Sequence, residues 1–161
     1  MLFRSSARGN GATGRGIAFA QYKNLAAFCA VVANVAVDRT GHVRVTRAVA
    51  AGDAGLAINP DGIINQIEGG IIQSASWTLK EQIKFDRQRI TTHSWADYPI
   101  FTFNDAPAVE VHIINQPHER PLGVGEGSQG PAVAAIANAI ANATGKRLRD
   151  LPFTADKLRN A

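Results

Sequence analysis

The first third of the chain alternates between hydrophobic and polar or small residues, which is typical of β-strands. Residues 16–22 alternate well enough for one strand, and residues 28–38 form a stronger pattern that contains four valines. The turn residues Asp38-Arg39-Thr40-Gly41 separate this segment from the clean alternation of residues 42–49. Because a short turn between two alternating segments favours a hairpin, we predict an antiparallel pair with one solvated face.

A helix is predicted from residue 60 to about residue 80. Asn59 can cap its N-terminus, and Pro60 suits the first helical position, where no N–H is needed. One side of this helix collects Ile64, Ile67, Ile71 and Ala75, and the other collects Gln66, Gly69, Gly70 and Gln73. Each glycine costs about 1 kcal/mol relative to alanine in a helix interior. The glycine side therefore predicts either close packing or a ligand that lies along the helix.

The second half of the chain mixes both kinds of pattern. Residues 82–86 and 89–92 suggest a second hairpin, residues 95–107 an aromatic, proline-containing connection, and residues 109–114 a strand. Pro131 then opens an alanine-rich helix over residues 132–144, which Gly145 ends. Its predicted apolar face is Val133, Ile136, Ala137 and Ile140.

These elements predict an α+β fold in which antiparallel β-hairpins pack with two main helices. Residues 1–14 contain many small residues and no periodic apolar pattern, so we expect a flexible lead-in. Residues 15–161 are expected to form one unit, because no domain boundary interrupts them.

Composition and charge limit the class of protein. With 45% hydrophobic and 19% charged residues, the chain is typical of globular proteins. It has no apolar run of membrane-spanning length and no recognisable export signal, so we expect a cytoplasmic protein, or a periplasmic one if a segment elsewhere carries a signal. The net charge of +4 comes largely from basic residues near both ends, but no aromatic residues are interleaved with them, which argues against nucleic acid as a partner. The single cysteine, Cys29, cannot hold an iron–sulfur cluster by itself.

The stretch Gly123-Val124-Gly125-Glu126-Gly127-Ser128-Gln129-Gly130 is the main candidate for chemistry. Its glycines allow a tight turn and a close approach of the main chain to a ligand. Glu126 stands just before a helix N-terminus, whose N–H groups favour anions. An ordinary turn with an acidic residue near the helix dipole would have the same pattern, so both interpretations stay open.

Three other kinds of site fit the sequence poorly. The glycine spacing matches the dinucleotide-binding fingerprint, with Asp150 downstream, but a polar, proline-rich loop precedes the glycines where a buried strand is needed. A serine hydrolase built on Ser128 would need glycine where Glu126 stands. The four histidines lack the paired spacing of zinc sites.

Two stretches of the chain resemble a known family when they are taken together. The first is Asn59-Pro60-Asp61-Gly62 with Gln66-Ile67-Glu68-Gly69-Gly70, and the second is Gly123-Val124-Gly125-Glu126 with the alanine-rich helix that follows. They resemble the C-terminal part of the molybdenum-binding large subunit of the xanthine dehydrogenase/aldehyde oxidase family, and most closely the branch that contains the isoquinoline 1-oxidoreductase β-subunit. The resemblance implies that the fold is part of a larger molybdopterin-binding domain.

The resemblance also implies an activity, the oxidative hydroxylation of an aldehyde or an N-heterocycle. In this family the metal is held by the dithiolene of a molybdopterin, here expected as the cytosine dinucleotide, and not by protein ligands. The family's catalytic glutamate, which deprotonates a metal-bound hydroxyl group, falls on Glu126, and a glutamine that contacts the pterin falls on Gln66. The remaining residues expected to bind the cofactor are Gly69, Gly70, Gly123, Val124, Gly125 and Gly127.

The implied partners are the remainder of the large subunit, a small subunit with [2Fe-2S] clusters, and the small-molecule substrate. Two departures from the family stand out. Relatives usually have proline directly after the glutamate, where this chain has Gly127, and their large subunit is several times longer. The alternatives are therefore a non-catalytic remnant that binds a partner, or a nucleotide-binding module that uses the glycine loop.

Overall fold

The computed structural model describes residues 11–161, so most of the predicted lead-in lies outside the described residues. The described part contains β1 (Gly11–Gln21), the 3-10 turn η1 (Tyr22–Asn24), β2 (Phe28–Asp38), β3 (Val43–Asp53), α1 (Pro60–Leu79), β4 (Ala108–Ile113), α2 (Gln129–Thr144) and α3 (Ala155–Asn160). Residues 11–14 were expected in the lead-in but belong to β1. β1 therefore begins earlier in the sequence than the hydrophobic pattern indicates.

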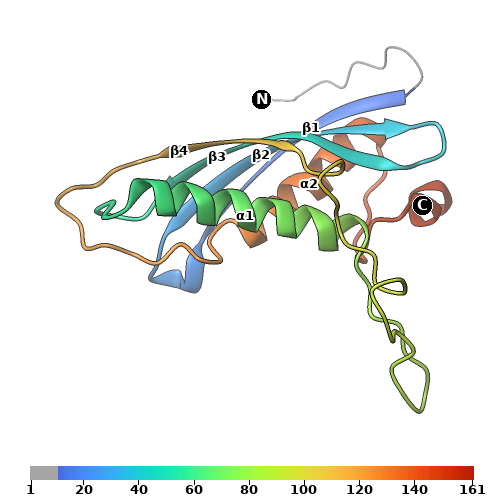
Figure 1. Ribbon diagram of the computed structural model, residues 1–161. Helices are drawn as coiled ribbons and strands as arrows, with labels where there is room; N and C mark the ends of the chain where they lie inside the picture. The colour runs from blue at the N-terminus through green and yellow to red at the C-terminus, as the bar shows by residue number, and fades with distance from the viewer. Residues whose placement is uncertain (1–10) are drawn as a thin grey trace.

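The strands form one sheet in the order β1-β2-β3-β4 (Figure 1). The predicted hairpin between β2 and β3 is confirmed, and β1 joins it in antiparallel fashion. Asp38 closes the hairpin turn, because its Oδ1 accepts hydrogen bonds from the N–H and hydroxyl of Thr40 and from the N–H of His42, at 2.7–2.9 Å. β4 runs parallel to β3, which the hydrophobic pattern did not predict.

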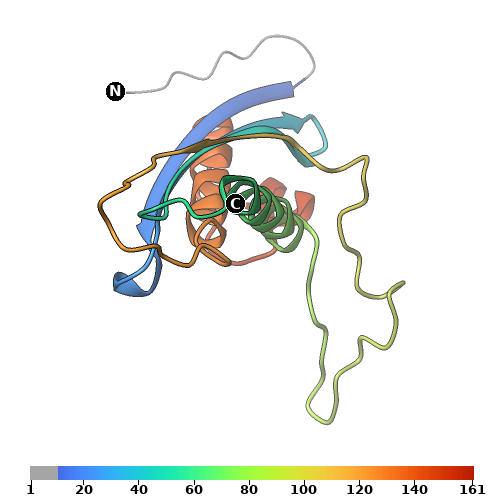
Figure 2. The same cartoon turned by 60° about the vertical axis from the view of Figure 1, so that its left-hand side comes forward.

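Both long helices lie on the same face of the sheet (Figure 2). Alternate residues of β2 are buried toward them, namely Cys29, Val31, Ala33, Val35 and Val37. α1 contributes Ile63, Ile67, Ile71 and Ala75 to the same core, whereas Ile64, which was predicted to lie on this face, is only partly buried. The predicted α+β class with two main helices is confirmed.

α2 packs against β1 through small residues. Its buried face includes Ala132, Ala135, Ile136, Ala139, Ile140 and Ala143. The prediction was therefore right for Ile136 and Ile140 and wrong for Val133 and Ala137, which are only partly buried. On β1, a Cβ added at Gly14 or Gly16 would overlap the main chain of α2. The alanine face therefore exists because the helix backbone lies directly against two glycines of the strand.

Two side chains of α2 also form hydrogen bonds with main-chain groups of β1. Asn142 accepts a hydrogen bond from the N–H of Arg15 at 3.0 Å, and Asn138 donates one to the carbonyl of Ile17 at 3.0 Å. Exposed strand edges promote pairing with other chains, and these two bonds occupy one N–H and one C=O group of the edge.

α2 begins two residues earlier than predicted, at Gln129, so Pro131 is the third helical residue. This position is still compatible with proline, because the first N–H groups of a helix have no partner within the helix. The predicted second hairpin is reduced to a single bridge between Phe85 and Ile90 within a projecting loop (Figure 1). That loop is clamped at its base by an ion pair between Lys80 and Asp105 at 2.8 Å.

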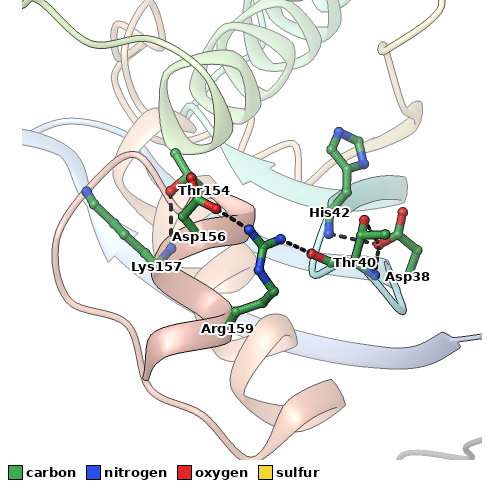
Figure 3. Close-up of polar contacts among 7 residues, drawn as sticks. All are labelled: Asp38, Thr40, His42, Thr154, Asp156, Lys157 and Arg159. Carbon is green, nitrogen blue, oxygen red and sulfur yellow. Dashed lines mark hydrogen bonds and ion pairs between the residues drawn. The ribbon is translucent and has the colours of Figure 1, made fainter.

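The short helix α3 was not predicted. Thr154 caps it by accepting a hydrogen bond from the N–H of Lys157 at 3.4 Å. As Figure 3 shows, Arg159 bonds to both Asp156 and the carbonyl of Thr40 in the β2–β3 turn. The C-terminal segment is therefore tied to the hairpin, about 120 residues away in sequence.

Candidate functional site

The glycine loop before α2 is held against α1 by one buried serine. The Ser128 hydroxyl donates a hydrogen bond to the carbonyl of Ile67 at 3.0 Å, and Ser128 is fully buried. Within the loop, the N–H of Gly127 donates to the carbonyl of Val124 at 3.0 Å, and the N–H of Gln129 donates to the carbonyl of Glu126 at 3.2 Å. These bonds form a compact turn, which brings the two sequence motifs side by side.

The two adjacent glycines of α1 have different surroundings. A Cβ added at Gly70 would overlap the Ser128 hydroxyl, so close packing inside the chain is sufficient reason for glycine at this position. A Cβ added at Gly69 would meet nothing within 4 Å. Packing within the described residues therefore gives no reason for glycine at position 69, and the expected cofactor contact there stays a prediction.

Gln66 and the glycine loop line a shared open groove of about 480 Å³. Its walls are Leu56, Ile58, Asn59, Gly62, Ile63, Gln66, Pro121, Leu122, Gly123, Val124 and Gly125. The Gln66 side chain is exposed, and its Oε1 lies 4.0 Å from the position of a Cβ added at Gly125. At Gly123 an added Cβ would meet nothing within 4 Å, so the main chain of the loop is accessible from the groove.

Glu126 lies next to the groove without being one of its wall residues. Its side chain is exposed, and the hydroxyl of Tyr22 donates a hydrogen bond to its Oε2. Tyr22 belongs to η1, between β1 and β2, and no pattern in the sequence indicated that it would contact the glycine loop. The structure thus adds one residue to the candidate site.

Of the predicted site residues, Gln66, Gly123, Val124 and Gly125 are brought together at the groove. Gly127 is buried within the turn, and a Cβ there would make ordinary van der Waals contact with Val124. Gln73, on the same side of α1 as Gln66, accepts a hydrogen bond from the side-chain amide of Gln129 at 3.1 Å. This amide pair, like Ser128, joins the start of α2 to α1.

The described residues do not have the arrangement of a dinucleotide-binding unit. β4 ends at Ile113, and residues 114–128 between it and α2 contain no strand. After α2, residues 145–154 contain none either. Since the fingerprint needs a strand that leads directly into the first glycine, the glycine spacing alone does not make a nucleotide site.

The remaining chemistry of the described part is limited. Burial raises the pKa of the Cys29 thiol to about 11, so this residue is an unreactive member of the core. No group of three or more His, Cys, Asp or Glu side chains in residues 11–161 is arranged to hold a metal ion. In the same range, no helix is both long enough and apolar enough to cross a bilayer.

Comparison with known proteins identifies the family to which the chain belongs. A family model described as the molybdopterin cofactor-binding domain matches residues 5–107. A nicotinate dehydrogenase subunit of Pseudomonas putida is 47% identical over a region that covers 98% of this chain and 14% of the relative. The beta subunit of isoquinoline 1-oxidoreductase from Brevundimonas diminuta is 33% identical over 93% of this chain and 19% of the relative.

Solved structures agree with these relatives. Quinoline 2-oxidoreductase from Pseudomonas putida 86 superimposes with a TM-score of 0.77 at 29% identity, covering 83% of this chain and 18% of that chain. Aldehyde oxidoreductase from Desulfovibrio gigas gives a TM-score of 0.72 at 30% identity, covering 84% of this chain and 15% of that chain. The chain therefore spans less than a fifth of the length of these four proteins. It belongs to the molybdopterin cofactor-binding family of the xanthine dehydrogenase and aldehyde oxidase type, as its two sequence motifs predicted.

Proposed function

We propose that this chain is the cofactor-binding C-terminal part of a molybdenum hydroxylase large subunit, in which Glu126 is the catalytic base. The observation that carries the proposal is the position of the glycine loop. Ser128 ties this loop to α1, so that Gln66 and the main chain of Gly123 and Gly125 face one groove. Glu126 is exposed and follows directly after Gly125, which is a wall residue of that groove.

The residues of the groove fit an organic cofactor such as molybdopterin. The exposed amide of Gln66 can donate and accept hydrogen bonds at once, as the polar edge of a pterin requires. The open positions at Gly69 and Gly123 let a flat ligand approach the backbone closely. When bound, the cofactor supplies a molybdenum centre that accepts electrons from the substrate.

In this proposal the candidate site residues have separate tasks. Gln66 and the backbone of Gly123 and Gly125 bind and orient the cofactor. Glu126 removes a proton in the reaction, a task that suits an exposed carboxylate at the edge of the groove, since a base must lie within hydrogen-bond reach of its proton. Val124 also lines the groove, whereas Gly70 and Gly127, which were expected to contact the cofactor, lie against the protein itself and shape the helix and loop beside it.

The substrate class proposed is an N-heterocycle or an aldehyde. The names of the relatives support it, since they include a nicotinate dehydrogenase, an isoquinoline 1-oxidoreductase and an aldehyde oxidoreductase. We also propose the cytosine dinucleotide form of the cofactor, and [2Fe-2S] clusters on a small partner subunit that carry the electrons away.

The test uses the complete enzyme that contains this chain, purified with its partner subunits. Molybdenum and pterin are measured together with turnover of nicotinate, isoquinoline and an aromatic aldehyde. Glu126→Gln should keep the molybdenum content and lower turnover by about 10²- to 10⁴-fold, because it removes a base without a change of shape. Wild-type turnover in this variant would refute the catalytic assignment, and wild-type enzyme that contains no molybdenum would refute the proposed function as a whole.

A further inference from the structure

We infer that Tyr22 is a positioning residue, which holds the Glu126 carboxylate in the orientation needed for catalysis. The inference rests on the function proposed above, because it gives Tyr22 a role only if Glu126 is the base. It adds a residue from a part of the chain that neither sequence motif includes.

The geometry places the tyrosine and the carboxylate together across the fold. Tyr22 lies in η1, at the end of the sheet where β1 turns into β2, and the loop that leads to α2 passes beside this turn in both views (Figures 1 and 2). The Tyr22 hydroxyl donates a hydrogen bond to Oε2 of Glu126, which is 104 residues away in sequence. The ring is half-buried, whereas Glu126 is exposed. The better-fixed partner therefore restrains the freer one.

The turn that carries Tyr22 is strained. Lys23 has φ 51° and Asn24 has φ 59°, so two consecutive non-glycine residues are in the left-handed region. Such conformations are disfavoured for residues with a Cβ, asparagine being a partial exception, and they cluster at functional sites. The turn is closed by two backbone bonds, from Tyr22 N–H to the Ala27 carbonyl at 2.8 Å and from Ala26 N–H to the Tyr22 carbonyl at 2.9 Å. These two bonds hold the main chain of Tyr22 in place at the end of the sheet.

The turn fixes the main chain of the loop, and in the described structure the Tyr22 hydroxyl is the hydrogen-bond partner of the Glu126 carboxylate. Gly125 and Gly127 flank Glu126, and glycine leaves the backbone more conformational freedom than any other residue. A hydrogen bond from Tyr22 supplies a restraint on the carboxylate from outside the loop.

The test is Tyr22→Phe in the complete enzyme, with Tyr98→Phe as the matched control. Tyr98 is the only other tyrosine of the chain, and its hydroxyl also donates to a glutamate, Glu81, at 2.7 Å, but in the projecting loop. Tyr22→Phe should lower kcat per bound molybdenum by about 10- to 100-fold, the usual effect of losing a charge-assisted hydrogen bond. KM and the molybdenum content should stay within about twofold of wild type, and Tyr98→Phe should behave as wild type.

Two further measurements separate positioning from a general structural role. In the Glu126→Gln background, adding Tyr22→Phe should cause no further loss of turnover, because the two residues act as a unit. A crystal structure of the molybdenum-loaded enzyme should show one Glu126 rotamer bonded to Tyr22, and several rotamers in Tyr22→Phe.

The outcomes distinguish this inference from the function on which it rests. If Glu126→Gln abolishes turnover and Tyr22→Phe leaves kcat unchanged, the positioning role is wrong and the catalytic assignment stands. Additive losses in the double variant, or a Tyr22→Phe effect confined to KM or molybdenum content, also overturn the positioning role. Full turnover in Glu126→Gln overturns both.

Discussion

The buried hydroxyl of Ser128 donates a hydrogen bond to the main-chain carbonyl of Ile67 in α1, at 3.0 Å. This bond joins the second sequence motif to the first, and it connects the loop that carries Glu126 to the helix that carries Gln66. Ser128 does not cap its own helix, because its side chain is directed to α1 instead. The relative position of the two motifs therefore depends on this serine.

Ser128→Ala should destabilise the protein by about 1 kcal/mol, because it removes one buried hydrogen bond. It should also weaken cofactor retention, since the glycine loop loses its attachment to α1. Thermal unfolding and molybdenum content of the purified enzyme check the two effects. Ser94→Ala is the control, because that serine bonds to Asp97 in the exposed loop and its loss should alter neither measurement.

Gly70→Ala and Gly69→Ala should have opposite effects on stability. At position 70 the new Cβ would overlap the Ser128 hydroxyl, so we expect a loss of about 1–3 kcal/mol. At position 69 the space is open, and alanine should add up to about 1 kcal/mol through its higher helix propensity.

Denaturant unfolding of both variants measures these changes. In the Ser128→Ala background, Gly70→Ala should cost much less, because the overlapping oxygen is gone. A stable Gly69→Ala enzyme that has lost molybdenum would support a cofactor along this side of α1, and one with full molybdenum content would argue against a contact at position 69.

Gln66→Ala should lower cofactor retention and leave the fold intact. The exposed amide makes no contribution to the core, so the unfolding temperature should be unchanged. Loss of one or two hydrogen bonds to the pterin should weaken cofactor binding by about tenfold. The molybdenum-to-protein ratio after dialysis measures this, with Gln88→Ala in the projecting loop as control. Equal ratios in the two variants would remove Gln66 from the site.

The ion pair between Asp105 and Lys80 should make stability depend on pH in the acid range. Hydrogen bonds from Lys80 and from the Thr102 N–H, with a smaller contribution from the Thr102 hydroxyl, lower the pKa of Asp105 from 3.8 to about 2. Because the folded pKa is below the unfolded value, the stabilisation is complete above 3.8 and is lost as the pH falls from there to about 2. Since both side chains remain about 30% exposed, solvent screens the pair, and we expect a contribution of at most about 1 kcal/mol at neutral pH.

Asp105→Asn should therefore be less stable than wild type at pH 7, and the difference should shrink toward zero near pH 2. Urea unfolding at a series of pH values measures it. Lys80→Met should flatten the same pH dependence by removing the partner cation. A constant difference between Asp105→Asn and wild type from pH 7 to pH 2 would contradict this account of the ion pair.

Sequence periodicity was sufficient for the local elements. Asn59 and Pro60 begin α1 as predicted, and Gly145 ends α2 in the left-handed conformation with φ 76°. The hairpin of β2 and β3 follows from alternation and from the turn residue Asp38. The family was also recognisable, because the two motifs occur in the right order and spacing.

Other features could not be read from local patterns. The buried face of α2 consists of alanines because Gly14 and Gly16 of β1 lie against its backbone, and a single helix gives no sign of such a partner. The parallel pairing of β4 with β3 depends on how the chain crosses the helical face of the sheet. The second hairpin was wrong in extent, because an exposed, isolated pair of short segments has no core to stabilise it.

By itself, the sequence determined where the two long helices and the four strands lie, within a few residues, which family the chain belongs to, and which glutamate and glutamine are candidates for its chemistry. These features depend on neighbouring residues or on short motifs, and the role of Glu126 and Gln66 stays a prediction. Only the tertiary structure decided that the Ser128 hydroxyl leaves no room for a side chain at position 70, and that Tyr22 bonds to Glu126. Both relationships join residues more than 50 positions apart. Contacts over such separations are set by the packing of the whole sheet against its helices, which no local pattern records.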